Sequence, residues 1–196
     1  MIDNPRSPRV RAVAKLAKRE ARSQTGLFLL EGPQAVSEAL TFRPELIVDL
    51  FATPTALERH PGIAAAAAET DLEVEFVTEQ VLEAMADTVT PQGVVAVCRQ
   101  FPTSVKDILA GQPKLIAILE EVRDPGNAGT IIRAADAAGA DAVIFTGRSV
   151  DLYNPKVVRA TTGSLFHLPV AVDNELESVI ERTKAVGVQV IAAPWR

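Results

Sequence analysis

Short apolar runs alternate with helical patterns along the whole chain, and residues that favour turns separate them. An apolar run of about four to eight residues bounded by turns indicates a buried strand, whereas apolar positions that recur about every third or fourth residue indicate a helix. The pattern predicts strands at residues 26–32, 46–51, 74–77, 94–98, 115–119, 142–145, 169–172 and 188–192. It predicts helices at residues 33–40, 55–69 with an interruption near Pro61, 79–86, 105–109, 129–138, 155–161 and 175–186. This alternation predicts an α/β fold.

The predicted elements divide into two α/β units. Residues 1–100 are expected to form a small α/β sandwich, residues 101–113 a linker with a short helix, and residues 114–196 a second unit with a parallel sheet. The second unit stops directly after its last predicted strand, at Pro194 to Arg196. Parallel sheets need helices on both faces. We therefore expect either that the chain is a fragment or that another subunit covers this end.

Composition is typical of a soluble globular protein, because 47% of the residues are hydrophobic and 23% are charged. No apolar run approaches the roughly 20 residues that a membrane-spanning helix needs, and the N-terminus lacks the apolar core of a secretory signal. We therefore expect a cytoplasmic protein without membrane contact. Cys98 lies alone in a predicted strand, where we interpret it as a small core residue.

Basic residues are concentrated at the N-terminus, although the net charge of the whole chain is −5. Residues 1–22 contain seven basic and two acidic side chains, a net charge of +5, so the remaining 174 residues carry −10. Arg11, Lys15, Lys18 and Arg22 recur at helical spacing and are predicted to line one face of a helix. A basic stripe on an acidic body is typical of a surface that binds a phosphate backbone. A solvated helix face explains the same pattern, and charge alone does not separate the two interpretations.

A glycine-rich loop joins one predicted strand of the second unit to the helix that follows it. The loop contains Pro125, Gly126, Asn127 and Gly129, and Arg133 follows within the helix. In open α/β sheets, ligands bind where such a helix begins, at the carboxyl end of a strand. We expect Asn127 to cap the helix and Arg133, which lies among apolar residues, to bind a phosphate or a carboxylate. The glycine spacing does not match a dinucleotide-binding fingerprint, and the lysine of a nucleoside-triphosphate loop is absent.

A second polar cluster lies later in the second unit. Lys156 and Arg159 share one helical face, and three hydroxyl residues flank Gly163, a combination that suits contact with a polyanion. The alternative is a capped helix end in which Gly163 is the residue after the cap. We interpret His167 as a structural hydrogen-bonding residue and not as a catalytic base. His60 falls in the other unit, so no metal site is predicted.

Three segments resemble a known family. The run from Asp124 to Ala135 resembles the first signature motif of the SpoU (TrmH-like) RNA 2′-O-ribose methyltransferases, which belong to the SPOUT superfamily. The run from Lys156 to Val170 resembles the segment that follows in these enzymes. Residues 28–32, together with residues 91–97, resemble their N-terminal substrate-binding domain. The segments occur in the family's order and span most of the chain.

The resemblance implies an RNA-recognition sandwich, similar to small ribosomal-protein folds, followed by a SPOUT domain. It implies methyl transfer from S-adenosylmethionine to a ribose 2′-hydroxyl of ribosomal or transfer RNA, by a homodimer. Arg133 matches the family's catalytic arginine, and Asn127 matches the asparagine that supports the same site. Since an arginine side chain stays protonated in proteins, we expect Arg133 to hold and polarise the phosphate–hydroxyl pair and not to act as a base. The cations expected to hold RNA phosphates are Arg11, Lys15, Lys18, Arg22, Lys156 and Arg159.

The resemblance ends near the last residues of the chain. Family members continue with a Gly-x-Glu segment and an Ile-Pro-Met … Ser-Leu-Asn run, which thread a C-terminal trefoil knot. Those segments form most of the S-adenosylmethionine pocket and much of the dimer interface, and neither is present, so no cofactor-binding residue is assigned. Two other functions fit the residues: an RNA-binding module without catalysis, and an α/β enzyme that binds a phosphate ester at the Asn127 loop.

Overall fold

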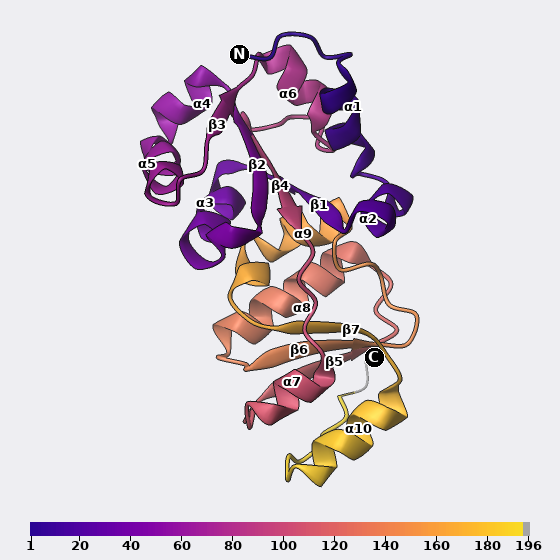
Figure 1. The fold of residues 1–196 in the computed structure, drawn as a ribbon. Helices are drawn as coiled ribbons and strands as arrows, with labels where there is room; N and C mark the ends of the chain where they lie inside the picture. Colours follow the sequence, from indigo (N-terminus) through magenta and orange to yellow (C-terminus); the bar gives the residue numbers. More distant parts are fainter. Residues whose placement is uncertain (194–196) are drawn as a thin grey trace.

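The computed structural model describes residues 1–193 and contains two β-sheets with helices packed around each of them (Figure 1). The first sheet has the order β1-β4-β2-β3 and consists of β1 (Leu27–Glu31), β2 (Ile47–Ala52), β3 (Val74–Phe76) and β4 (Val94–Arg99). Strand β4 runs antiparallel to β1 and β2, and β3 runs parallel to β2. The second sheet is parallel, in the order β5-β6-β7, and consists of β5 (Ile116–Glu120), β6 (Ala142–Thr146) and β7 (Val170–Asn174). The predicted α/β fold with a parallel second sheet is confirmed.

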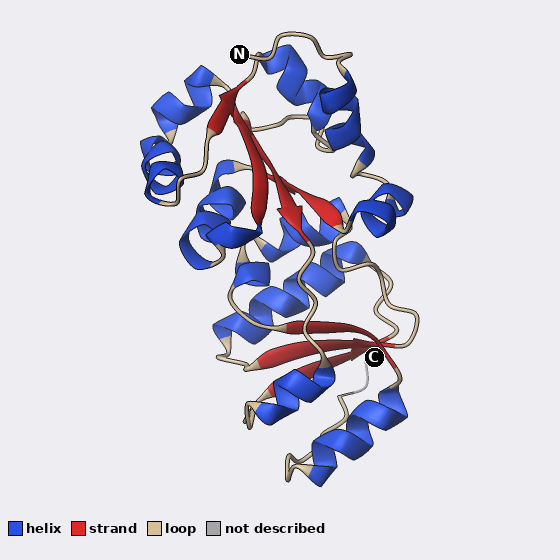
Figure 2. Ribbon diagram, viewed as in Figure 1, coloured by secondary structure: helices blue, strands red, loops and turns tan. Residues whose placement is uncertain are grey.

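Helices cover both faces of each sheet (Figure 2). The helices of the first unit are α1 (Pro8–Lys15), α2 (Arg19–Thr25), α3 (Pro33–Phe42), α4 (Pro54–Arg59), α5 (Pro61–Glu69) and α6 (Glu79–Met85), with the short 3-10 helix η1 (Pro44–Leu46). Those of the second unit are α7 (Val105–Ala110), α8 (Pro125–Ala137), α9 (Pro155–Thr161) and α10 (Leu176–Ala185), with η2 (Ser164–Phe166). Helix α7 lies within the predicted linker and packs on the second sheet through Val105 and Ile108. Across residues 1–193, no helix combines the length and the apolar character needed to cross a membrane.

The strands are largely apolar because both of their faces are covered. In the first sheet, Leu29 packs with residues of α1 and α6, whereas Phe28 and Leu30 pack with residues of α3 and α5 on the other face. In the second sheet, Ile144 packs with residues of α7 and α10, whereas Phe145 packs with residues of α8 and α9. Phe28 and Phe145 belong to the same cluster of buried side chains. A continuous hydrophobic core therefore joins the two units.

The predicted strand at residues 188–192 is wrong. This segment has no regular structure and follows α10, whose end it closes through a hydrogen bond from the Val188 N–H to the Thr183 carbonyl oxygen. An apolar run does not provide its own partner strand, and no strand within residues 1–193 pairs with it. The predicted stop at Pro194 to Arg196 lies outside the described residues.

The basic N-terminal segment is not one continuous helix, because α1 ends at Lys15 and α2 begins at Arg19. Arg22, expected on an RNA-binding face, is only 2% exposed. Its Nη1 atom donates to the carbonyl oxygens of Leu16 and Ala17, both at 2.9 Å, and so satisfies acceptors just after the end of α1. The expectation that Arg22 lines a basic stripe is therefore wrong. Its side chain instead forms hydrogen bonds with the backbone of the turn between α1 and α2.

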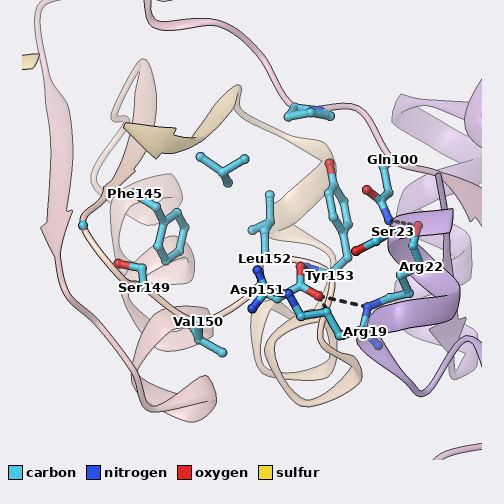
Figure 3. A pocket seen from close by; sticks show the side chains of 13 residues that line it. Arg19, Arg22, Ser23, Gln100, Phe145, Ser149, Val150, Asp151, Leu152 and Tyr153 are labelled. Atoms are coloured by element: carbon cyan, nitrogen blue, oxygen red, sulfur yellow. Dashed lines mark hydrogen bonds and ion pairs between the residues drawn. The ribbon is translucent and has the colours of Figure 1, made fainter. Parts of the chain in front are cut away.

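Arg22 also joins the two units (Figure 3). Its Nε and Nη2 atoms donate to Oδ2 of Asp151, in the loop after β6, at 3.0 and 2.7 Å. Beside this ion pair, the Tyr153 hydroxyl accepts a hydrogen bond of 2.8 Å from the Phe101 N–H, and the Tyr153 ring lies 4.8 Å from the ring of Phe28. Polar and aromatic contacts thus stabilise the contact between the two units at the edge of the shared hydrophobic core.

Helices α8 and α9 approach each other closely at Gly129. A Cβ atom at this position would lie 2.4 Å from the Cβ atom of Ala160 and 2.8 Å from the carbonyl oxygen of Val157. Because a real Cβ atom does not come so close to other atoms, the two helices keep this separation only with glycine at position 129. Gly129 therefore sets the spacing of the helix layer between the two sheets.

We expect Arg22→Ala to lower the free energy of unfolding by about 3 kcal/mol, because it leaves Asp151 and two backbone carbonyl oxygens without their donor. Urea unfolding followed by circular dichroism measures this change. Arg19→Ala, an exposed position on the same helix, is the matched control and should change stability by less than about 0.5 kcal/mol. Equal stability of the two variants would contradict the structural role of Arg22.

Gly129→Ala should destabilise the protein by about 1–3 kcal/mol, since the added methyl group overlaps Ala160 and the backbone of α9. The same unfolding measurement applies. Gly62→Ala in α5 is the control, because a Cβ atom there meets nothing within 4 Å, and alanine favours helix over glycine. A neutral result for Gly129→Ala would show that α8 and α9 are not as close as described.

Candidate functional site

Helix α8 starts at the carboxyl end of β5, earlier than predicted. Its cap is Asp124, whose Oδ1 atom accepts a hydrogen bond of 2.7 Å from the Asn127 N–H. Pro125 occupies the first helical position, which proline favours because it has no N–H to satisfy, so the cap falls on the residue before it. The prediction that Asn127 caps the helix is therefore wrong. Its exposed side-chain amide has no hydrogen-bond partner among the described residues and is available to a ligand.

Arg133 projects from the exposed side of α8. The apolar residues Ile132 and Ala135 turn towards the core, whereas Gly126 and Thr130 precede Arg133 on its own side of the helix. Arg133 therefore faces solvent and does not pack among its apolar neighbours. Within residues 1–193, no carboxylate lies within ion-pair distance of its guanidinium group. This cation is open to an anionic ligand.

Lys156 and Arg159 lie on one side of α9, as expected, but their contacts differ. Lys156 is exposed in the first turn. Arg159 donates through Nη1 to Oε2 of Glu31 at 2.7 Å and to Oδ2 of Asp87 at 2.9 Å. Both carboxylates belong to the first unit, and Glu31 is buried. Arg159 is a second arginine that joins the units, so its expected role in holding RNA phosphates is not supported.

The remaining predicted cations lie on the surface. Arg11 and Lys15 are exposed on α1, and Lys18 is exposed in the turn that follows it. The neighbouring Arg9 is paired with Asp49 and Glu75 of the first sheet. Of the six predicted phosphate-binding cations, four therefore remain exposed and without a carboxylate partner in the described chain: Arg11, Lys15, Lys18 and Lys156.

A cavity of about 190 Å³ opens between the units at the carboxyl end of β6 (Figure 3). Arg19 and Ser23 of α2 line one side, and Ser149 and Asp151 of the loop after β6 line the other. Ligands of open α/β sheets bind at this end of the strands. Arg19 is absent from the predicted set, although it follows Lys15 by four residues. The sequence pattern does not reveal this position, because it depends on the packing of α2 near the end of a strand in the second unit.

A second cavity, of about 310 Å³, lies beside Arg159. Its uncharged polar lining residues are Gln34, Thr88, Thr90, Gln92 and Thr162. The chain ends α9 with two left-handed residues, Thr162 with a φ of 49° and Gly163 with a φ of 99°. A capped helix end at this position is confirmed, and Thr162 is itself left-handed although it is not glycine.

Comparisons with known proteins match both units. Residues 29–104 match the family model for RNA 2′-O ribose methyltransferase substrate binding, and residues 114–195 match that of the SpoU rRNA Methylase family. The 23S rRNA (guanosine(2553)-2′-O)-methyltransferase RlmP of Bacillus subtilis is 35% identical over 193 residues, which cover 96% of this chain and 71% of that protein. The rRNA methyltransferase 3 of human mitochondria is 32% identical over 185 residues, which cover 89% of this chain and 42% of that protein.

Solved structures agree with these matches. The AdoMet-bound rRNA methyltransferase from Sinorhizobium meliloti is 33% identical, with a TM-score of 0.81 over 96% of this chain and 69% of that chain. The SpoU methyltransferase AviRb from Streptomyces viridochromogenes, in complex with the cofactor AdoMet, is 27% identical, with a TM-score of 0.75 over 91% of this chain and 67% of that chain. The order of the two units, the loop-helix with Asn127 and Arg133, and these matches lead to one conclusion. The chain belongs to the SpoU family of RNA 2′-O-ribose methyltransferases.

Proposed function

We propose that this chain methylates a ribose 2′-hydroxyl of ribosomal RNA, with Arg133 at the reacting group. The observation that carries the proposal is the open position of Arg133 on α8. Arg9, Arg22 and Arg159 are held by carboxylates of the protein, whereas Arg133 faces solvent and has no such partner within residues 1–193. Several relatives are named for methylation of ribosomal RNA, which favours that substrate over transfer RNA.

The chemistry requires a positioned cation. A ribose hydroxyl is a weak nucleophile at neutral pH, so the enzyme must orient it towards the methyl group and assist loss of its proton. Arg133 carries a fork of N–H donors and a permanent positive charge, which suits it to hold a phosphate oxygen next to the hydroxyl. We assign Asn127, in the first turn of α8, to orient the same RNA segment through its free amide.

RNA binding is assigned to the exposed cations of both units. Arg11, Lys15 and Lys18 form a surface on the first unit, and Lys156 lies on α9 of the second. Each phosphate neutralised by such a cation releases counterions and adds to affinity. Arg22 and Arg159 are left out of this set, because their charges are already compensated across the contact between the units.

The methyl donor of this family is S-adenosylmethionine. Small-molecule sites usually enclose about 300–1,000 Å³, and the cavity at the carboxyl end of β6 holds about 190 Å³. This cavity is smaller than such a site, and we assign no cofactor contact to residues 1–193. The homodimer expected from the family stays a prediction.

Arg133→Ala should reduce methyl transfer by roughly 100-fold or more, because it removes a cation that stabilises charge at the reacting group. Since Arg133 is exposed and unpaired, the melting temperature should stay unchanged. Transfer of a radiolabelled methyl group to ribosomal RNA measures the effect. Arg182→Ala, at an exposed position on α10, is the control and should keep full activity. If Arg133→Ala turned over like the control, the assignment would fail; RNA binding without turnover in every variant would favour a non-catalytic module.

Lys15→Ala and Lys18→Ala should weaken RNA binding and reduce the salt slope of the binding constant by about one unit each, since each cation neutralises about one phosphate. Fluorescence anisotropy with an RNA fragment over a range of salt concentrations measures the slope. Lys184→Ala on α10 is the control. An unchanged slope in both test variants would place the RNA elsewhere on the molecule.

A further inference from the structure

His167 lies between two carboxylates that belong to different units. Its Nε2 atom is 2.6 Å from Oε2 of Glu38 on α3, and its Nδ1 atom is 2.7 Å from Oδ2 of Asp136 on α8. About a quarter of each of the three side chains is exposed to solvent. His167 therefore bridges the first unit and the helix that carries Arg133.

The bridge requires a doubly protonated ring. A neutral imidazole has one N–H and donates to one acceptor, whereas an imidazolium donates from both nitrogen atoms. Both partners of His167 are carboxylates, which only accept when they are ionised. Two hydrogen bonds of this length with both carboxylates ionised therefore belong to the charged form of His167.

The surroundings hold the three side chains in this arrangement. The Phe42 ring of α3 lies 4.3 Å from the imidazole ring, and the Gln34 amide donates to Oε1 of Glu38 at 3.1 Å. Gly163, with a φ of 99°, brings the chain so close to α3 that a Cβ atom there would lie 2.4 Å from Cγ of Glu38. The backbone conformation at Gly163 therefore brings the segment that contains His167 close to α3, and the contact between His167 and Glu38 follows from this approach.

The charged groups that face His167 are Glu38 from α3 and Asp136 from α8. Partial burial lowers the pKa of His167, but the hydrogen bonds to Glu38 and Asp136 and the charges of these carboxylates outweigh burial. The net result is a pKa above the usual value of 6.5. The bridge is therefore complete below about pH 6.5 and is lost as the pH rises through the raised pKa of the folded protein.

We propose that His167, as an imidazolium, is a positioning residue that fastens α3 of the RNA-binding unit to α8 and thereby places Arg133 relative to the bound RNA. Asp136 lies one helical turn after Arg133, so the contact reaches the segment of α8 that carries the arginine. The consequence for catalysis rests on the proposed role of Arg133. The bridge from His167 to Glu38 and Asp136 rests on the observed distances and does not depend on that role. Since arginine side chains stay protonated in proteins whereas histidine changes charge near neutral pH, His167 makes this contact sensitive to pH.

Nuclear magnetic resonance of the two histidines tests the bridge directly. In a titration between about pH 5 and pH 9, the midpoint of the His167 ring should lie above the usual value of 6.5. Glu38→Gln, which keeps the size of the side chain and removes its charge, should shift this titration to lower pH. The His60 signal should not move in Glu38→Gln. A His167 ring that titrates at its usual pH and ignores Glu38→Gln would overturn the proposal, whatever the activity.

Kinetics of methyl transfer test the consequence. His167→Gln should raise the Michaelis constant for RNA by roughly threefold or more at pH 6.5, with a smaller change in kcat, because it misplaces the RNA and keeps Arg133. It should also remove the pH dependence that the bridge gives to this constant. His60→Gln is the matched control and should behave as the unchanged protein.

Two outcomes separate the bridge from the proposed function. If the resonance data show the bridge but the unchanged protein and every variant transfer no methyl group, the proposed function fails and the bridge stands. A normal pH profile and Michaelis constant in an active His167→Gln would overturn the positioning role.

Discussion

The contact between the α8–α9 layer and the first unit determines how the two units of the protein are arranged. Helix α9 packs against β1, and the buried cluster that includes Phe28 of the first unit continues to Phe145 of the second. Burial of apolar surface drives such a contact but does not orient it, because the hydrophobic effect has no direction. Orientation comes from polar groups around its edge: the pairs of Arg22 with Asp151, Arg159 with Glu31, and His167 with Glu38.

This contact sorts the cations of the protein into two groups. A charge that is removed from water must be paired, since an unpaired buried charge is strongly unfavourable. Arg22 and Arg159 lie at the contact, and carboxylates hold them there. Arg133 and the exposed residues around α1 lie away from it and keep their charge for a partner from solution. Which of these cations are paired and which are open therefore depends on tertiary contacts and not on the density of basic residues along the chain.

Because of the same contact, residues of the first unit line one side of the cavity at the carboxyl edge of the second sheet. Arg19 and Ser23 of α2 face the loop after β6 across the cavity at that edge (Figure 3). A ligand in this position would touch both units, and the arrangement of the units would affect how it binds. The first unit matches the substrate-binding family model and the second unit matches the methylase model, so this contact joins the parts of the chain that correspond to the two functions.

Local pattern was sufficient for much of the fold. Seven predicted strands and the break near Pro61 follow from apolar runs and turn residues, because these reflect interactions between near neighbours. The local sequence also includes the residues that begin α8, because Asp124 caps the helix and Pro125 is its first residue. The cap expected from the sequence was Asn127. The strand expected at 188–192 is wrong, since pairing requires an edge elsewhere in the molecule.

By itself, the sequence determined the α/β class, the order of the two units and the loop-helix that carries Arg133, which also marks the family. Tertiary structure alone decided which basic residues face solvent and which histidine contacts are formed. The physical reason is distance along the chain: Arg22 and Asp151 are 129 residues apart, as are Glu38 and His167, and Arg159 is 128 residues from Glu31. Burial and ion pairing depend on such distant neighbours, which helical spacing and charge density along the sequence do not reveal.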